Sequence, residues 1–294
     1  MGSPRWLTFL AHLIFLQQFR FSARALLNPV DFLALQSIRR GLSDLPGSGY
    51  FSTWDFTAEP CDFSGVYCDG DRVIALNLGD PRAGSPGLTG RIDPAVGKLS
   101  ALAELTIVPG RVTGPLPETI SQLKLLRFLA VSRNFISGEI PSGLGELRGL
   151  QTLDLSFNQL TGAIPISVGS LPALSNVVLS HNHLTGPVPP YNRLSGEISP
   201  MFSTVENLYL NNNRFIGRVP ASIVDRLLAA NIQTLYLQHN YLSGIGINPT
   251  VEIPLSSSLC LQYNCMVLPV ETPCPLKAGP DKSRPSSQCI EWKG

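Results

Sequence analysis

The sequence has almost no net charge and no dense run of one sign. Its 22 basic and 21 acidic residues give a net charge of +1 over 294 residues. Binding to phosphates or to an anionic membrane surface requires clustered lysine and arginine. The composition therefore argues against nucleic acid and against anionic membranes as partners.

No apolar run is long enough to cross a bilayer, which takes about 20 residues. The first apolar stretch, residues 6–16, follows the basic Arg5 and precedes an A-x-A phrase at residues 23–25. This order predicts a secretory signal peptide over residues 1–25, with a buried helix as the alternative. We therefore expect a secreted, extracellular protein without direct membrane insertion.

Motifs of catalysis and metal binding are also missing. No His-Glu-x-x-His or Gly-x-Ser-x-Gly phrase occurs in the chain. His181 and His183 have no neighbouring carboxylate or third histidine in sequence that would complete a zinc site. We expect a protein that is not an enzyme, with no catalytic residues, no metal and no cofactor.

What the sequence does contain is a fixed period of 24 residues. Five glycines at this spacing end the same short phrase, namely Gly90, Gly114, Gly138, Gly162 and Gly186. A period of this size predicts a stack of supersecondary units in which each unit contacts its neighbours. Such an architecture favours binding over catalysis.

Each repeat combines a strand pattern with an asparagine. In residues 150–165, Leu153 and Leu155 are two apart, which places both on the buried face of a strand and Asp154 on the solvent face. Asn158 follows at a turn, where its amide can bond backbone groups that are left unpaired. The pattern predicts an asparagine ladder of Asn134, Asn158, Asn182, Asn213 and Asn240.

The part of the repeat after the asparagine contains a glycine and a proline. Gly162 suits a tight bend, and Pro165 would end any hydrogen-bonded extension. The period itself is interrupted near residues 187–200, where two consecutive prolines exclude a central strand. A truncated repeat and an inserted loop both fit this interruption, which we expect to disturb the local stacking.

These motifs resemble the plant extracellular leucine-rich repeat class, whose unit is L-x-x-L-x-L-x-x-N-x-L-x-G-x-I-P. Residues 126–141 and 150–165 match the unit nearly in full, and residues 26–68 resemble the N-terminal cap of the class. The resemblance implies an α/β solenoid, a right-handed superhelix with a parallel β-sheet on its concave face and disulfide-capped ends. Within the class, the chain is similar to kinase-less, receptor-like and polygalacturonase-inhibitor-like members.

The predicted organisation has four parts. They are a signal peptide (1–25), an N-terminal cap (26–72), about seven leucine-rich repeats (73–246, interrupted near 187–200) and a Cys-rich C-terminal tail (247–294).

All six cysteines lie outside the repeats. An even number in a secreted chain suggests disulfides, and the open apolar ends of a solenoid need caps. Cys61 and Cys68 are close in sequence and are predicted to pair. The remaining four, Cys260, Cys265, Cys274 and Cys289, allow three pairings.

The solvent-facing positions of the strands define the candidate binding site. Aromatic side chains on this face supply the rigid apolar area that is typical of binding hot spots, and few charges accompany them. At about 4.8 Å per strand, seven strands give a face roughly 30 Å long. The candidate ligand-binding residues are Phe128, Arg133, Asp154, Phe157, His181, Tyr209, Asn211, Tyr236 and His239.

The expected function is recognition of a peptide or an extracellular protein through this concave face, in the plant apoplast or cell wall. The resemblance implies a membrane partner such as a receptor kinase ectodomain, because the chain is similar to kinase-less members. One alternative is an inhibitor of a secreted cell-wall-degrading hydrolase. Another is a wall-associated structural protein held by polysaccharide.

Overall fold

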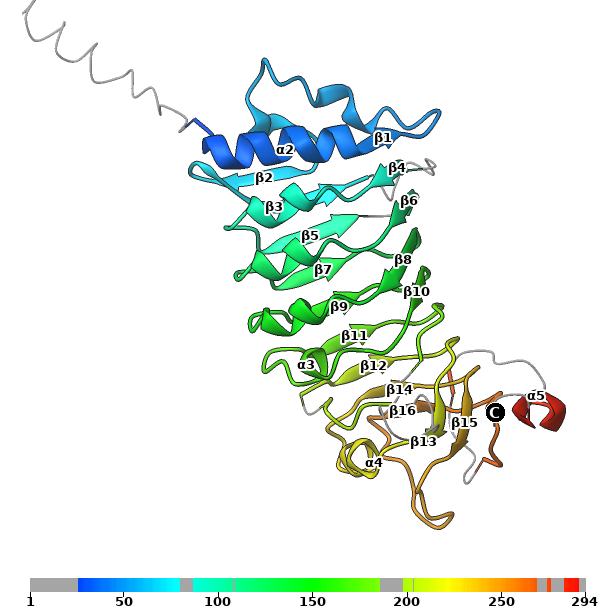
Figure 1. Cartoon of the computed structure of the whole chain (residues 1–294). Coiled ribbons are helices and arrows are strands. Elements are labelled where there is room, and N and C mark those ends of the chain that lie inside the picture. The colour runs from blue at the N-terminus through cyan, green and yellow to red at the C-terminus, as the bar shows by residue number, and fades with distance from the viewer. Residues whose placement is uncertain are drawn as a thin grey trace, which may run out of the picture.

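The computed structural model describes residues 26–79, 87–107, 109–185, 198–202, 204–268, 274–275 and 283–290. The predicted signal peptide and most of the interrupted repeat lie outside these residues. Within them the chain winds into an elongated solenoid, with the N-terminal cap at one end and the last repeats at the other (Figure 1). The predicted leucine-rich repeat solenoid with disulfides at its ends is confirmed.

One sheet runs along the whole solenoid, and its solvent side is the predicted concave face. Strand β2 pairs antiparallel with β3, and every later pair is parallel. Equivalent residues pair across repeats, as Leu153 does with Leu129 and Val177. The strands are β2 (Val66–Asp69), β3 (Arg72–Leu78), β5 (Glu104–Ile107), β7 (Phe128–Ala130), β9 (Thr152–Asp154), β11 (Asn176–Val178), β12 (Asn207–Tyr209), β14 (Thr234–Tyr236) and β16 (Ser258–Cys260).

The interrupted repeat leaves this sheet continuous. Strands β11 and β12 flank the interruption and still pair in register, with Val177 opposite Leu208. The disturbance that we expected in the stacking is therefore not present in the large sheet. Strand β16 also lies within the segment that the sequence analysis assigned to the Cys-rich tail, so the sheet extends beyond residue 246.

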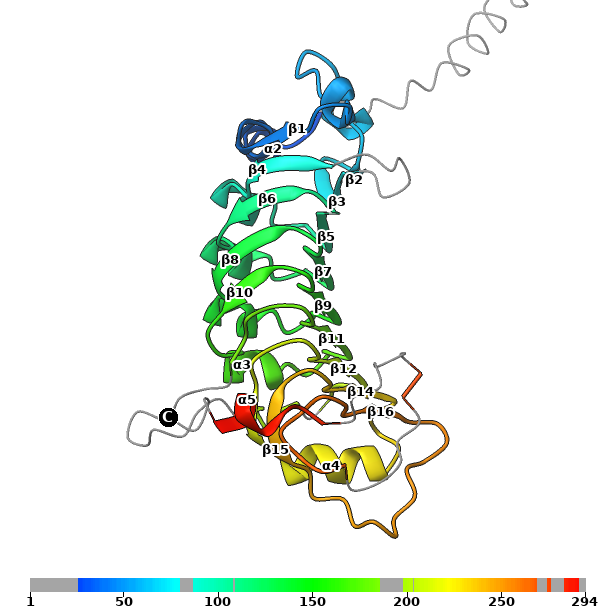
Figure 2. The ribbon, with the colours of Figure 1, turned by 90° about the vertical axis from the view of Figure 1, so that its right-hand side faces the viewer.

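A second sheet lies beside the first, on the part of each repeat that follows the ladder asparagine (Figure 2). Gly90, Gly114 and Gly138 lie within its strands at positive φ, which glycine adopts without strain. The chain bends at Gly162 as predicted, but the short strands of this sheet, each paired with its counterpart one repeat away, were not predicted. The strands are β1 (Leu42–Asp44), β4 (Leu88–Arg91), β6 (Arg111–Gly114), β8 (Phe135–Glu139) and β10 (Gln159–Thr161), with a separate pair β13 (Ile216–Arg218) and β15 (Tyr241–Gly244).

Short helices complete the repeats and the caps. Most are single turns, because each repeat has only a few residues to return the chain to the next strand. The 3₁₀ helices are η1 (Tyr50–Thr53), η2 (Pro60–Asp62), η3 (Pro94–Lys98), η4 (Glu118–Gln122) and η5 (Ser142–Glu146). The α-helices are α2 (Pro29–Gly41), α3 (Ile166–Gly169), α4 (Ala221–Leu228) and α5 (Ser286–Ile290).

The core is a single apolar column between the two sheets and the helices, and the asparagine ladder runs beside it. Asn158 illustrates one rung: its Oδ1 accepts from the backbone N–H of Ile136 at 3.0 Å, and its Nδ2 donates to the carbonyls of Val131 and Leu155. All five predicted members make this contact. The structure adds a sixth, Asn264, beside β16.

The N-terminal cap is built on α2, which begins after Asn28. The Asn28 side chain accepts from the backbone N–H of Val30, as an N-cap residue does. On the buried face of α2, Asp31 receives two hydrogen bonds of 3.0 Å from the Arg72 guanidinium and one of 2.9 Å from the Val73 N–H. These bonds fix the helix to β3, and the Cys61–Cys68 disulfide closes the cap.

The C-terminal end carries the other two disulfides. Cys260 pairs with Cys274, and Cys265 pairs with Cys289. The structure thus selects one of the three pairings that the sequence left open. The second disulfide ties the short helix α5 to the turn that follows β16.

Candidate binding face

The side chains of the concave face form columns, because equivalent residues of neighbouring strands lie opposite each other. One column contains Phe128, Thr152, Asn176, Asn207 and Thr234. The next contains Ala130, Asp154, Val178, Tyr209 and Tyr236. Residues of one column are neighbours, so the columns show which of the predicted residues can contact the same part of a ligand.

The four predicted aromatic residues do not form one cluster. Phe128 and Phe157 are 38% and 37% exposed, but they lie in different columns. Tyr209 and Tyr236 are neighbours, with ring centroids 5.1 Å apart in an edge-to-face arrangement. Tyr236 is only 9% exposed, so the prediction that its ring is available on the surface was wrong. Phe128 and Tyr209 remain as the accessible apolar contacts of the strands themselves.

Four of the predicted residues form, together with Asn212 and Tyr263, a stacked column at one edge of the sheet. Each member precedes a ladder asparagine and has a left-handed backbone with φ between 53° and 59°. We call this set the edge column: Arg133, Phe157, His181, Asn212, His239 and Tyr263.

Contacts within the edge column occupy much of its surface. The Arg133 guanidinium lies 4.3 Å from the Phe157 ring centroid, and the His181 ring stacks on Phe157 at 4.0 Å. The Nδ2 of Asn212 lies 3.2 Å from Nε2 of His181. Phe157 therefore has a side chain against each face, which leaves its edge as the surface open to a ligand.

Both histidines of the edge column are held toward their neutral form. Burial lowers the pKa of His181, and the charges of His239 and Arg133 lower it further. Burial likewise lowers the pKa of His239, with Arg284 as the second cause. Neutral imidazoles between two guanidinium groups suit stacking and hydrogen bonding, and they avoid a row of like charges.

The polar residues of the face differ from the prediction in two ways. Asn211, predicted as a ligand contact, is only 7% exposed and offers little surface to a ligand. Asp154 is half-buried, and its Oδ1 already accepts from the N–H and hydroxyl of Ser156. The structure reveals two acceptors that the sequence analysis missed, since the buried Oε1 atoms of Gln238 and Gln262 have no hydrogen-bond partner.

The strand pattern could have signalled Gln238 and Gln262, because both occupy the same outward position in consecutive repeats. Gln238 is 3% exposed beside the tyrosine pair. A buried carbonyl oxygen without a partner costs free energy, but these two oxygens are covered and do not lie on the accessible surface. The accessible part of the face is represented by Phe128 and the half-buried Tyr209, and it carries little formal charge.

No cluster of three or more metal-ligating side chains occurs among the described residues. In the same part of the chain, no helix has the length and apolar character needed to traverse a bilayer.

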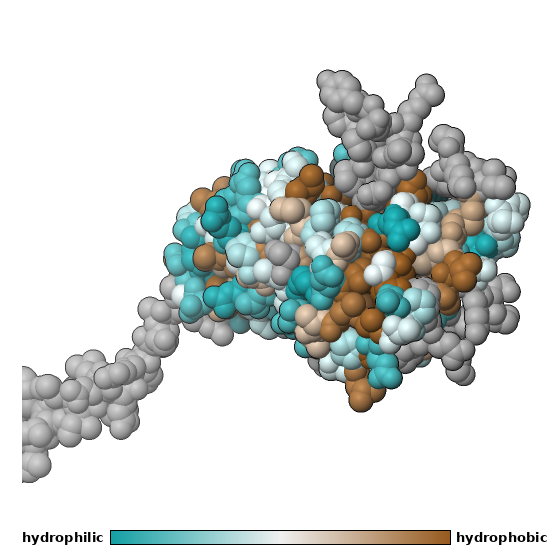
Figure 3. Space-filling view, turned by 90° about the horizontal axis from the view of Figure 1, so that it is seen from below, coloured by the Kyte–Doolittle hydropathy of each residue, from teal (hydrophilic) through white to brown (hydrophobic). Residues whose placement is uncertain are grey.

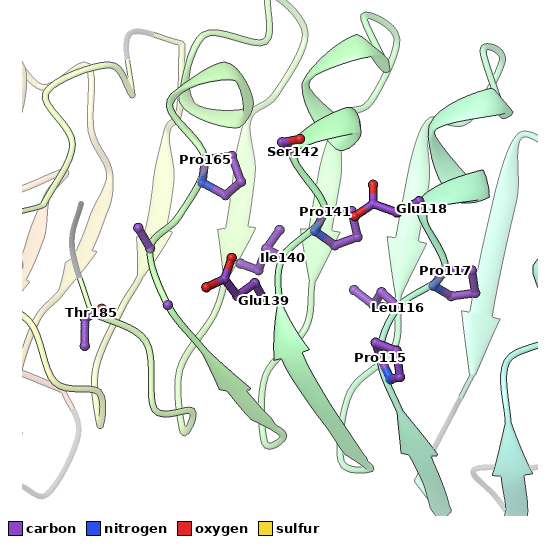
Figure 4. Close-up of a pocket in the computed structure, with 12 residues that line it drawn as sticks. Pro115, Leu116, Pro117, Glu118, Glu139, Ile140, Pro141, Ser142, Pro165 and Thr185 are labelled. Atoms are coloured by element: carbon purple, nitrogen blue, oxygen red, sulfur yellow. The ribbon is translucent and has the colours of Figure 1, made fainter. Parts of the chain in front are cut away.

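A second surface feature is a groove of about 710 Å³ between the second sheet and the short helices. Figure 4 shows proline rings and the carboxylates of Glu118 and Glu139 along it. Its lining contains no histidine or cysteine. Viewed from the last repeats, apolar side chains also gather at the C-terminal end of the solenoid (Figure 3), where Val251 and Leu255 are exposed.

Comparisons with known proteins agree with this architecture. Residues 28–69 match the leucine rich repeat N-terminal domain family, and residues 149–171 match the Leucine Rich Repeat family. No curated protein sequence matches the chain significantly.

Three solved structures show the similarity over most of the chain. A plant ice-binding protein is 28% identical with a TM-score of 0.66, covering 82% of this chain and 81% of its own. The structure titled PEPR1-AtPEP1 is 29% identical with a TM-score of 0.62, and the match covers 81% of this chain and 35% of that one. A chain of the BIR3–SERK2 complex from Arabidopsis thaliana is 27% identical with a TM-score of 0.52, at 63% and 93% coverage.

The chain thus spans about a third of the PEPR1-AtPEP1 chain that it matches, and most of the other two. The protein has the leucine-rich repeat fold, and it is similar to plant proteins of that fold.

Proposed function

We propose that this protein is an extracellular recognition protein that binds a peptide or a partner protein through its concave face. The observation that carries the proposal is a continuous parallel sheet with the accessible aromatic rings of Phe128 and Tyr209 on its solvent side. Such a face buries apolar area around a few anchors while satisfying hydrogen bonds. The absence of a metal cluster in the described residues is compatible with binding but does not carry the proposal.

The similar structures support a membrane partner. Their titles name one complex of PEPR1 with AtPEP1 and one complex of BIR3 with SERK2. By analogy, we propose that a receptor kinase ectodomain is the partner and that the protein acts in the plant apoplast after secretion. An inhibitor of a secreted wall hydrolase, or a wall polysaccharide-bound protein, remains the alternative that the same experiment addresses.

The test measures binding of the full chain to a panel of purified receptor kinase ectodomains, a secreted polygalacturonase and pectin. The double variant Phe128→Ala/Tyr209→Ala should lose at least about tenfold in affinity for its partner, as expected for anchor residues. Phe135→Ala is the matched control, because Phe135 is an exposed aromatic of β8 on the second sheet.

Selective loss in the double variant would support the concave face, and the identity of the bound member would decide between receptor and hydrolase. Equal binding by wild type and both variants would reject this face as the site. Binding to pectin alone would favour the structural alternative.

A second candidate function rests on one specific observation. Thr113 and Thr161 occupy equivalent positions on the second sheet, and their hydroxyls donate to the carbonyls of Gly90 and Gly138 at 3.1 and 3.3 Å. This holds the side chains in a regular row, and a plant ice-binding protein has a similar fold. Ice binding would be supported if the protein inhibits ice recrystallisation and Thr161→Tyr abolishes this inhibition. The control variant Thr152→Tyr, on the concave face, should retain it.

A further inference from the structure

The C-terminal segment, residues 283–290, lies against the last two repeats with little burial. Of residues 283–289, Arg284 and Cys289 are half-buried and the other five are exposed. Exposed side chains of this kind gain little from apolar burial. Its position must therefore depend on specific contacts, and those contacts centre on Arg284.

Arg284 fits between two tyrosines from different repeats. Its guanidinium carbon lies 4.0 Å from the ring centroid of Tyr241, in β15, and 4.6 Å from that of Tyr263, in the edge column. Its Nε donates to the carbonyl of Asn240 at 2.9 Å. We call Tyr241, Tyr263 and the Asn240 carbonyl the arginine clamp.

The clamp matches the chemistry of a guanidinium group in particular. A planar cation can stack on aromatic rings while an N–H in its plane reaches an acceptor, whereas an ammonium offers only a point charge. The remaining contacts of the segment are a backbone N–H of Arg284 that donates to the carbonyl of Asn264, and an Nη1 bond to Gln288 within the segment itself. Among the contacts described for residues 283–289, the noncovalent ones that join the segment to the solenoid all come from Arg284.

A covalent tether compensates for this small contact area. The Cys265–Cys289 disulfide joins the segment to the turn beside Tyr263, five residues beyond Arg284. A short tether of this kind holds a group at an effective concentration on the order of millimolar. The internal arginine therefore occupies the clamp even if its intrinsic affinity is modest, and a partner with additional contacts can replace it.

We propose that the arginine clamp is a binding site for an arginine side chain of a partner protein, and that Arg284 fills this site from within the chain until the partner displaces it. The clamp lies at the loop edge of the last repeats, next to His239, whose ring is 5.0 Å from that of Tyr263. The site is therefore distinct from the anchors Phe128 and Tyr209, and it does not depend on the concave-face proposal.

The test uses the full, disulfide-bonded chain and two labelled peptides. One has the sequence of residues 283–290 with serine in place of Cys289, and the other also has alanine in place of Arg284. Fluorescence anisotropy measures their binding to wild type and to Arg284→Ala. We expect Arg284→Ala to bind the arginine peptide at least about tenfold more tightly than the alanine peptide, and wild type to bind neither peptide in that range.

Two further variants, each combined with Arg284→Ala, locate the binding. Adding Tyr241→Leu should abolish the preference for the arginine peptide. Adding Tyr67→Leu, at an exposed tyrosine of the N-terminal cap, should leave it unchanged. If Arg284→Ala does not fold, as judged by its thermal unfolding, Arg284→Lys takes its place, because it keeps the charge and gives up the planar group.

Equal affinity of a folded Arg284 variant for both peptides would overturn the proposal. Arg284 would then serve only to attach the C-terminal segment. The same conclusion would follow if wild type bound the arginine peptide as tightly as the variant does, because an occupied clamp cannot accept a second arginine.

Discussion

The two ends of the solenoid are closed by different means. At the N-terminal end, the side chains of Phe51, Trp54 and Phe63 are buried, and the ring centroids of Phe51 and Phe63 lie 5.0 and 5.4 Å from that of Trp54. At the C-terminal end, two disulfides hold an exposed segment over the last strand. The first end is therefore a small core of its own, whereas the second depends on covalent bonds and on the two cation–π contacts of Arg284.

The largest expected effect tests the aromatic core of the N-terminal cap. Trp54→Ala removes a buried ring and the hydrogen bond from its Nε1 to the carbonyl of Ser64. We expect the free energy of unfolding to fall by about 3–5 kcal/mol, measured by chemical denaturation. A loss below about 1 kcal/mol would be within the range of ordinary surface substitutions and would contradict the comparison.

A second effect concerns the ion pair of the same cap. Asp31→Asn keeps the shape and one acceptor but removes the charge that the Arg72 guanidinium contacts. The Arg72 side chain is 30% exposed and can reach water, so we expect a loss of roughly 2–3 kcal/mol, toward the lower end for broken buried pairs. Asp31→Leu/Arg72→Met should recover part of this loss, because apolar replacement leaves no unpaired charge.

The sequence predicted the large sheet because its signal is contained in each repeat. Leu153, Leu155 and Asn158 fix the buried face and the turn, and these assignments are confirmed. The second sheet could not be predicted in the same way. Its short strands around Gly114 and Gly138 pair only with equivalent segments a whole repeat away. Within a single repeat, the glycine and the proline indicate a bend and give no sign of this pairing.

The candidate site was predicted less completely for a related reason. Alternation along a strand shows which side chains point outward, but the exposed fraction depends on neighbours from other repeats. Tyr236 is covered in part by Tyr209 from the preceding strand. The faces of the Phe157 ring are covered by its edge-column neighbours Arg133 and His181. The chemistry of Gln238 also depended on its neighbours, since only the folded chain shows that its carbonyl oxygen has no partner.

A third prediction compares the disulfides of the two caps. Cys61→Ser/Cys68→Ser should lower the free energy of unfolding by about 2 kcal/mol, since the bond constrains a chain that is otherwise part of a packed cap. Cys265→Ser/Cys289→Ser should lower it by less than about 1 kcal/mol, because the exposed segment can detach before the rest unfolds.

Hydrogen exchange distinguishes the two outcomes for the C-terminal pair. Faster exchange confined to residues 283–290 would confirm local release, while a global shift would show that the segment is integral to the last repeats.

The smallest effect concerns acid, and it should be confined to the C-terminal half. The pKa values of His181 and His239 are lowered in the folded protein, so the unfolded chain binds more protons below its ordinary histidine pKa of about 6.5. Stability contributed by these groups is complete above that pH and is lost as the pH falls toward their folded values. The unfolding temperature should therefore decrease between pH 7.5 and 5.5, and less so in His181→Gln/His239→Gln.

The controls for this prediction use the same comparison. Described residues 26–79, which include the N-terminal cap, contain no histidine, so exchange there should not change over this pH range. Arg284→Ala should raise the pKa of His239, which NMR titration can measure, because the guanidinium charge contributes to its depression. An unchanged unfolding temperature in wild type would contradict the assignment.

The asparagine ladder gives the solenoid a direction. The Oδ1 of Asn158 accepts from Ile136 and its Nδ2 donates to Val131, and both partners belong to the repeat before it. The other rungs have the same sense, including Asn264 with Leu242 and Leu237. During synthesis, each newly made repeat therefore has unpaired backbone groups until the following one has emerged from the ribosome. The order of translation supplies the missing partner each time, and Asn264 is the last to arrive.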